Sequence, residues 1–191
     1  MKQLRISTLM AVVTLSIMLG ALALAVDDRD GKDKGRSLRA ELKGIEEPPV
    51  ILTEASGSFR GTISDDETQI DYELIYENLQ GTVTQSHIHV AQRLVNGGIS
   101  VWLCGTDTLP GPAGTPRCPS PNSGTVTGRL TAANVIGPAG QGVAAGEFAE
   151  LLRAMRQGLT YANVHSSLAP GGEIRGQIQV KNGEGHDRDD D

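Results

Sequence analysis

The sequence predicts a mainly β protein, an antiparallel Greek-key β-sandwich or barrel of about eight strands with one short helix. Three observations carry this prediction. The chain has 191 residues, of which 24 are glycine and only 3% are aromatic. Apolar and polar residues alternate over short segments, which is typical of half-buried strands. Clusters of Gly, Pro, Asn and Asp separate these segments and supply the turns between them.

The alternation is clearest in residues 37–42 and 69–76, where nearly every second side chain is apolar. Further short runs of apolar residues follow, each bounded by turn residues. The expected strands are 37–42, 57–63, 69–76, 86–91, 99–104, 124–130, 160–165 and 173–180.

Residues 147–157 depart from the period of two. Four apolar side chains recur there at helical spacing. They are Phe148, Leu151, Leu152 and Met155. Gly158 follows and is typical of the C-terminal end of a helix. This segment is expected to form the short helix and to cover one end or edge of the sheet.

The chain is expected to divide into four parts. Residues 1–25 begin with a short basic stretch and continue as an apolar run that ends in alternating alanines, which predicts a cleaved secretory signal peptide. An uncleaved membrane anchor is the alternative, because a spanning helix needs only about 20 apolar residues. The charged segments 26–36 and 181–191 cannot bury a core and are expected to be a disordered linker and a disordered acidic tail. The folded domain is expected to span residues 37–180.

Export and charge together limit the partners. Without residues 1–25 the chain keeps 15 of its 17 Lys and Arg against all 23 Asp and Glu, which is a net charge of −8. Such an acidic protein has no electrostatic reason to bind nucleic acid or an anionic membrane surface, and neither partner is expected. An uncleaved signal anchor would be its one link to a membrane. We expect a secreted, extracellular or periplasmic protein whose partner is an unidentified extracellular protein or small ligand.

The two cysteines, Cys104 and Cys118, are expected to form a disulfide, because disulfides persist in exported proteins. The residues between them are rich in Gly and Pro and therefore form a loop. A thiolate metal ligand or nucleophile is the alternative, which neither a third cysteine nor a C-x-x-C spacing supports.

Three of the four histidines lie in expected strands. His87 and His89 are two residues apart, so their side chains project from the same face. An imidazole on a facing strand, that of His165, could complete a set of three that suits copper or zinc and leaves a position for water. The alternative is structural, with the histidines hydrogen-bonded to backbone carbonyls, to Asn163 or to Glu173.

Glu173 and Arg175 follow a tight Pro-Gly-Gly turn. Because they are two residues apart in a strand, they share one face and could form an ion pair or hold a histidine in place. The sequence contains no nucleophile elbow, H-E-x-x-H motif, P-loop or dinucleotide-binding glycine motif. We therefore assign no catalytic residue and do not expect an enzyme.

Four motifs together resemble the CHRD domain. They are SHIHV at 86–90, NGG at 96–98 before an apolar strand, YANVHS at 161–166 and GEIRGQI at 172–178. The CHRD domain is named for chordin, an animal antagonist of bone morphogenetic proteins, and occurs singly in many exported bacterial proteins. The likeness covers about residues 38–180, and Ser166 stands where the family commonly has Thr. It implies an extracellular β-sandwich without a known reaction; chordin's cysteine-rich modules are missing, so growth-factor antagonism is not implied.

The three strand histidines also give a looser similarity to copper/zinc superoxide dismutase, another Greek-key sandwich with an H-x-H strand. That similarity would place His87, His89 and His165 at copper-ligand positions. The enzyme also needs a bridging histidine and a zinc cluster, which the remaining His186 cannot supply. Dismutase activity is therefore not expected, although a mononuclear site is compatible with the sequence.

Two functions follow from these patterns. The preferred one is a secreted, non-enzymatic binding or structural module of unknown ligand, in which the histidines stabilise the fold or shape a surface. The other is a mononuclear copper or zinc protein that uses His87, His89 and His165. Ring nitrogens about 3–3.5 Å apart or slightly wider would favour the metal site, because metal–nitrogen bonds are about 2.0–2.1 Å long.

Overall fold

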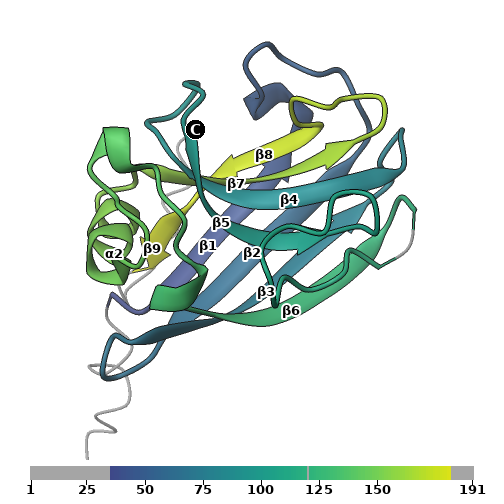
Figure 1. Cartoon of the computed structure of the whole chain (residues 1–191). Helices are drawn as coiled ribbons and strands as arrows, with labels where there is room; N and C mark the ends of the chain where they lie inside the picture. The colour runs from purple at the N-terminus through teal and green to yellow at the C-terminus, as the bar shows by residue number, and fades with distance from the viewer. Residues whose placement is uncertain (1–34, 120, 182–191) are drawn as a thin grey trace, which may run out of the picture.

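A single antiparallel sheet forms most of the protein and curls into a nearly closed barrel (Figure 1). The computed structural model describes residues 35–119 and 121–181. In this part of the chain the strands are β1 (Ser37–Lys43), β2 (Ser56–Ile63), β3 (Gln69–Glu77), β4 (Val83–Val90), β5 (Gly98–Gly105), β6 (Gly124–Thr131), β7 (Thr160–Ser166), β8 (Ile174–Gln177) and β9 (Gln179–Lys181). The predicted mainly β fold is confirmed.

The order of the strands around the barrel is β5-β4-β7-β8-β1-β2-β3-β6, and β9 pairs with β1 beyond β8. Three connections, from β3 to β4, from β5 to β6 and from β6 to β7, skip neighbouring strands, as Greek-key connections do. The edge strands β5 and β6 end this order. The hydroxyl of Tyr72 on β3 donates to Leu103 O on β5 at 2.6 Å and so links the two sides of the barrel.

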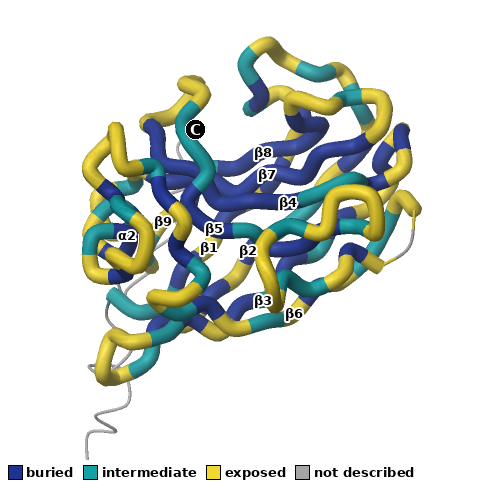
Figure 2. Tube along the Cα trace, in the orientation of Figure 1, coloured by how far each residue is buried: buried dark blue, intermediate teal, exposed yellow. Residues whose placement is uncertain are grey.

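The core lies inside the barrel because each strand turns its apolar residues inward (Figure 2). Along β1, Leu38, Ala40 and Leu42 are buried while the residues between them are exposed. Strand β3 shows the same alternation. β7 differs, since it is buried along its whole length. Something other than the core therefore covers the outer face of β7.

The segment 173–180 is not one strand, contrary to the prediction. It divides into β8 and β9 at Ile178, whose amide donates to Thr160 O at 2.9 Å. A bend is needed because β8 pairs with both β7 and β1, whereas β9 pairs with β1 alone. Gly176 allows the close approach, because a Cβ there would collide with the backbone carbonyl of Glu41.

The helix α2 (Phe148–Arg156) forms where it was predicted, at one end of the barrel (Figure 1). Its buried residues are the four expected apolar ones: Phe148, Leu151, Leu152 and Met155. Gly158 has a φ of +67° and its amide donates to Met155 O at 3.0 Å, which ends the helix.

The predicted signal peptide, nearly all of the 26–36 linker and nearly all of the 181–191 tail lie outside the described residues. At the two boundaries, Arg36 forms an ion pair with Asp65 and Lys181 is the last residue of β9. Among the described residues, no helix has both the length and the apolar character that crossing a membrane requires.

A disulfide joins Cys104 on β5 to Cys118, as predicted. The loop between them is also held by backbone hydrogen bonds, from Gly105 N to Pro116 O at 3.0 Å and from Cys118 N to Gly105 O at 2.8 Å. Gly111 at its tip packs on the indole of Trp102, where a Cβ would come within 2.6 Å of the ring. The stapled loop therefore covers Trp102 on the outside of β5.

Removal of this disulfide in a Cys104→Ser/Cys118→Ser variant should lower the free energy of unfolding by about 3 kcal/mol, because the unfolded chain gains the freedom of a loop of about 15 residues. Urea unfolding of both proteins measures the difference. Reduction of the wild-type protein should reproduce it, and an unchanged unfolding midpoint would contradict the expected stabilisation.

Candidate functional site

The three predicted histidines lie together on the outer face of the barrel, on β4 and β7. Ile88 and Val164 point into the core, so the alternate residues His87, His89 and His165 point outward. The antiparallel register pairs His87 with Asn163 and Gln85 with His165, which places His165 diagonally beside His87. Local β-geometry therefore brings the H-x-H pair and the third histidine together.

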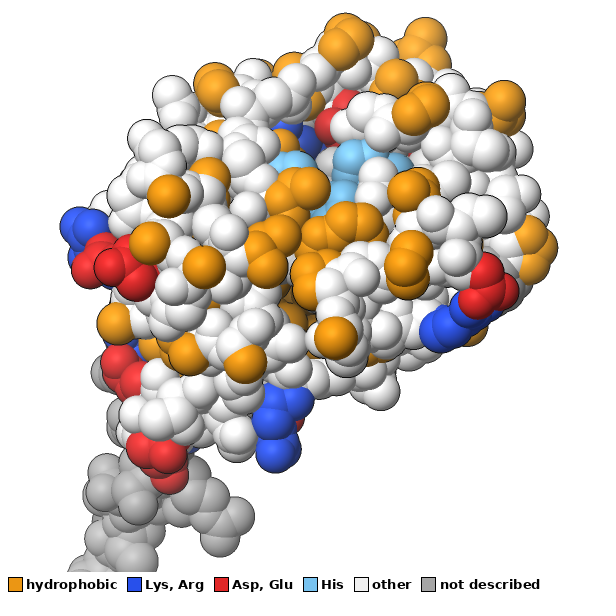
Figure 3. Space-filling model, in the orientation of Figure 1, with side chains coloured by type: hydrophobic (Ala, Val, Ile, Leu, Met, Phe, Trp, Pro, Cys, Tyr) orange, Lys and Arg blue, Asp and Glu red, His pale blue; other side chains and the backbone are white. Residues whose placement is uncertain are grey.

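Three loops cover this part of the outer face: residues 44–55, 91–97 and 167–173. The first two are joined by an ion pair between Glu46 and Arg93. Figure 3 shows histidine side chains in a hollow of the surface that apolar side chains border. The exposed fractions are only 1% for His87, 7% for His89 and 6% for His165.

The ring nitrogens of the three histidines converge. One ligand nitrogen from each ring can be chosen so that all three lie within 4.8 Å of one another. His87 Nδ1 lies 3.1 Å from His165 Nε2. Two nitrogens bound to one metal ion at 90–110° and about 2.0–2.1 Å would be separated by about 2.9–3.4 Å. This pair already has the spacing of two ligands.

Backbone carbonyls determine which nitrogen carries the proton in two of the rings. His89 Nδ1 lies 2.9 Å from Gly97 O, and His165 Nδ1 lies 2.9 Å from Pro170 O. Because a carbonyl oxygen only accepts, Nδ1 donates in both rings and Nε2 keeps a lone pair. A metal-binding histidine is typically held in this way, by a carbonyl at its second nitrogen.

His87 cannot satisfy both of its nitrogens in either neutral form. If Nδ1 carries the proton, it donates to His165 Nε2, and the buried Nε2 of His87 is an acceptor without a donor. If Nε2 carries the proton, the lone pairs of His87 Nδ1 and His165 Nε2 face each other. The buried Nε2 of His89 also has no hydrogen-bond partner among the described residues. A cation held by His87 Nδ1 and the Nε2 atoms of His89 and His165 would remove the facing lone pairs and satisfy His89 Nε2, and the proton of His87 would then lie on its own Nε2.

Burial keeps the cluster neutral. Desolvation, followed by the neighbouring histidines, lowers the pKa of His87 to about 2. Desolvation also lowers the pKa of His89 to about 4, against an opposing hydrogen bond with Gly97, and lowers that of His165. The imidazoles therefore present lone pairs, the form that binds metal.

The structure separates the roles of Asn163, Glu173 and Arg175. Asn163 Oδ1 lies 3.1 Å from His165 Nε2 and so reaches the cluster directly. Arg175 lies with its guanidinium 3.3 Å from the centre of the Tyr161 ring, which stacks parallel on His89. Arg175 thus contacts the cluster through Tyr161.

Glu173 instead joins the surrounding segments. Its carboxylate accepts hydrogen bonds from Thr53 Oγ1 at 2.9 Å, from Gln80 N at 2.7 Å and from Ser166 Oγ. Within the described residues it forms neither an ion pair with Arg175 nor a hydrogen bond with a histidine.

Glu47 belongs to the site and was not predicted from the sequence. It lies on the 44–55 loop, is 5% exposed, and reaches Gly172 beside Asn163. Burial raises the pKa of its carboxyl to about 7, against the opposing effects of Arg175 and of hydrogen bonding with Asn163. Glu47 precedes two prolines in a segment without periodicity, so no pattern in the sequence identifies it. Its burial in the structure does.

Trp102 on β5 completes the surroundings of the cluster. Its ring centre lies 4.3 Å from that of His87, with the two planes nearly perpendicular. It is the one tryptophan in the sequence. A change at His87 should therefore be visible in the fluorescence of a single indole.

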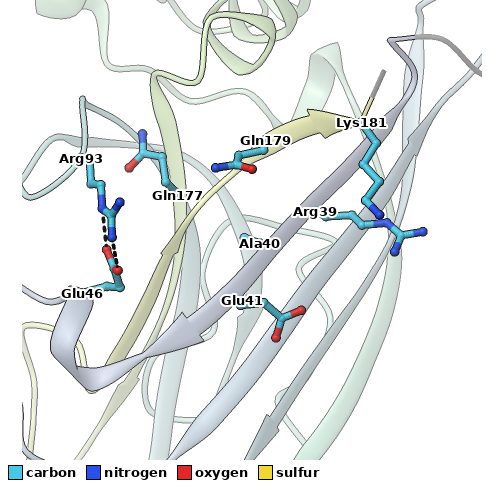
Figure 4. A pocket seen from close by; sticks show the side chains of 8 residues that line it. All are labelled: Arg39, Ala40, Glu41, Glu46, Arg93, Gln177, Gln179 and Lys181. Atoms are coloured by element: carbon cyan, nitrogen blue, oxygen red, sulfur yellow. Dashed lines mark hydrogen bonds and ion pairs between the residues drawn. The ribbon is translucent and has the colours of Figure 1, made fainter. Parts of the chain in front are cut away.

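An open groove of about 410 Å³, which none of the three histidines lines, lies on the outer side of β1 and β9 (Figure 4). It is lined by Arg39, Ala40, Glu41, Glu46, Arg93, Gln177, Gln179 and Lys181. The Glu46–Arg93 ion pair forms one wall, so two of these charges neutralise each other. The groove presents mixed surface charges, whereas the histidine cluster contains buried nitrogens of His87 and His89 that have no hydrogen-bond partner among the described residues.

The metal-free protein should lose stability as the pH falls below 6.5, the ordinary pKa of histidine. The folded chain resists protonation of the cluster that the unfolded chain accepts, which costs about 1.4 kcal/mol per pH unit for each excluded proton. Glu47 has the opposite effect on stability between pH 7 and 4.5, because its pKa is about 7 in the folded chain and 4.5 in the unfolded chain. Below pH 4.5 this compensation ends, so the loss of stability should become steeper. Urea unfolding across this range measures the slope. His89→Gln should make it shallower, and an equal slope would contradict the prediction.

Comparison with known proteins identifies one family. The CHRD domain profile matches residues 38–178, which is most of the chain. No curated protein and no solved structure matches the chain. The matched segment contains the three histidines, Asn163, Glu173 and both cysteines. The family and the disulfide together suggest an extracellular or periplasmic protein. The chain belongs to the CHRD domain family.

Proposed function

We propose that this CHRD-domain protein is an exported mononuclear metal protein that holds copper or zinc on His87 Nδ1, His89 Nε2 and His165 Nε2. The observation that carries the proposal is the convergence of three buried, neutral imidazoles whose inward nitrogens have too few protons to satisfy one another. This fit outweighs the expectation of purely structural histidines. Backbone carbonyls do hold His89 and His165, but at the nitrogens that point away from the cluster.

The donor type narrows the choice of metal. Imidazole suits zinc and copper, whereas calcium and magnesium require oxygen ligands. Three imidazoles leave at least one coordination position for a further donor. A bound zinc ion would act as a Lewis acid, and a bound copper ion could also exchange an electron.

A non-enzymatic extracellular binding or structural module is the second candidate. Six of the nine large apolar side chains that are exposed among the described residues lie on the three loops around the cluster. They are Ile45, Val50, Leu52, Leu94, Val95 and Leu168. Apolar surface gathered in this way favours a binding surface, although it does not identify the ligand.

Metal content tests the proposal. The exported protein, purified without a polyhistidine tag, should contain about one copper or zinc ion per chain or should bind one when the ion is added. His89→Gln should remove most of this binding because one of the three imidazoles is lost. His186→Ala is the matched control and should retain the metal. Circular dichroism and the intact disulfide establish that each variant is folded.

A protein that remains empty and resists loading with either ion would overturn the metal site and leave the binding module as the function. Equal metal content in the wild type and His89→Gln would instead exclude this cluster as the site.

The fluorescence of Trp102 should report which ion is bound. Its ring centre lies 4.3 Å from that of His87, so Cu²⁺ bound there should quench the emission strongly. Zn²⁺ has a filled d shell and no redox chemistry, so it should bind without strong quenching. Titration of the metal-free protein with each ion measures this. Quenching that persists in His89→Gln at the same Cu²⁺ concentration would show that it arises elsewhere.

A further inference from the structure

We propose that the side-chain oxygen of Asn163 is the fourth ligand of the metal, so that the protein itself supplies three nitrogens and one oxygen. This inference rests on the proposed metal site, but it concerns a residue whose loss can be tested separately. Asn163 is opposite His87 in the β4–β7 pairing and only 2% exposed. Its side chain projects from the same outer face of β7 as His165, two residues further along.

The first step is the distance. Asn163 Oδ1 lies 3.1 Å from His165 Nε2, and His87 Nδ1 lies 3.1 Å from the same nitrogen. Two donors bound to one metal ion at 90–110° and about 2.0–2.2 Å lie about 2.8–3.6 Å apart. The amide oxygen is therefore within the coordination shell that the imidazoles define.

The second step is the orientation of the amide. Asn163 Nδ2 lies on the side of Gly172 and Glu47, where a Cβ on Gly172 would approach it to 3.0 Å and would collide with Glu47 Oε1. Glu47 Oε1 is buried and has no other hydrogen-bond donor among the described residues, so an amide N–H is favoured over an amide oxygen on this side. With Nδ2 turned toward Glu47, Oδ1 is turned toward the histidines.

The third step is the number of protons. His165 Nε2 and His89 Nε2 both keep lone pairs, because Nδ1 of each ring donates to a backbone carbonyl. Asn163 Oδ1 is also an acceptor. Only His87 can bring a proton to this group of four, and its Nδ1 lies beside His165 Nε2. The amide oxygen therefore meets acceptors and no donor, an arrangement that a cation at the centre would stabilise.

A neutral amide oxygen is a weaker ligand than a carboxylate, and this difference supplies the test. Asn163→Leu removes the donor with little change in volume and should weaken Cu²⁺ binding by at least about tenfold. Asn163→Asp keeps an oxygen in place and adds a charge, so it should bind Cu²⁺ more tightly than the wild type. Competition with a chelator measures the affinity, and electron paramagnetic resonance of the Cu²⁺ form reports the ligands.

The electron paramagnetic resonance spectrum tests the role of Asn163 separately from the existence of the metal site. Asn163→Leu should retain the splitting from three imidazole nitrogens but shift the copper g and hyperfine values, and Asn163→Asp should shift them differently. Wild-type affinity and an unchanged spectrum in both variants would overturn the role of Asn163 while the three-histidine site stands. Absence of Cu²⁺ binding by the wild type would overturn the site as well. If Asn163→Leu does not fold, the isosteric Asn163→Asp decides.

Discussion

The pairing of β4 with β7 is the constraint on which the histidine cluster depends. Its register places His87 opposite Asn163 and brings His165 to the neighbouring position on the same face. A shift by one residue would turn the histidines of one strand into the core and its apolar residues outward. The buried Ile88 and Val164 therefore maintain the cluster, because their burial stabilises this register alone.

The three loops cover the histidine cluster through polar contacts with its side chains. Each of the three loops contributes a polar contact: Gly97 O to His89, Pro170 O to His165, and the carboxyl of Glu47 beside Asn163. These contacts orient the side chains and at the same time exclude water. Exclusion of water keeps the imidazoles neutral, so their nitrogens remain available as ligands. The loops thus determine the chemistry that the strands make possible.

The sequence predicted what depends on local periodicity. The period of two located the strands, the helical spacing located α2, and the same-face rule placed His87 beside His89. Other features depend on contacts between segments that are far apart in the sequence, and the periodicity of the sequence does not reveal such contacts. The bend at Ile178 arises because β8 and β9 have different partners, and Glu47 reaches the cluster from a loop more than a hundred residues away from Asn163. The sequence offered a histidine or Arg175 as alternative partners of Glu173, but its carboxylate binds Thr53 and Gln80, which no local pattern indicates.

The charge around the cluster bears on which oxidation state a bound copper ion would prefer. The proposed ligands are all neutral, so a divalent ion would keep its full charge in a buried site, with the nearby Arg175 adding to the positive potential. The Glu47 carboxyl, when ionised, offsets part of that charge from beyond the ligands, and a divalent ion would in turn favour its ionised form. Without this carboxylate, Cu⁺ would gain relative to Cu²⁺, because the smaller charge costs less to bury. In a copper-loaded protein, Glu47 would therefore connect the loop that covers the site to the redox balance of the metal.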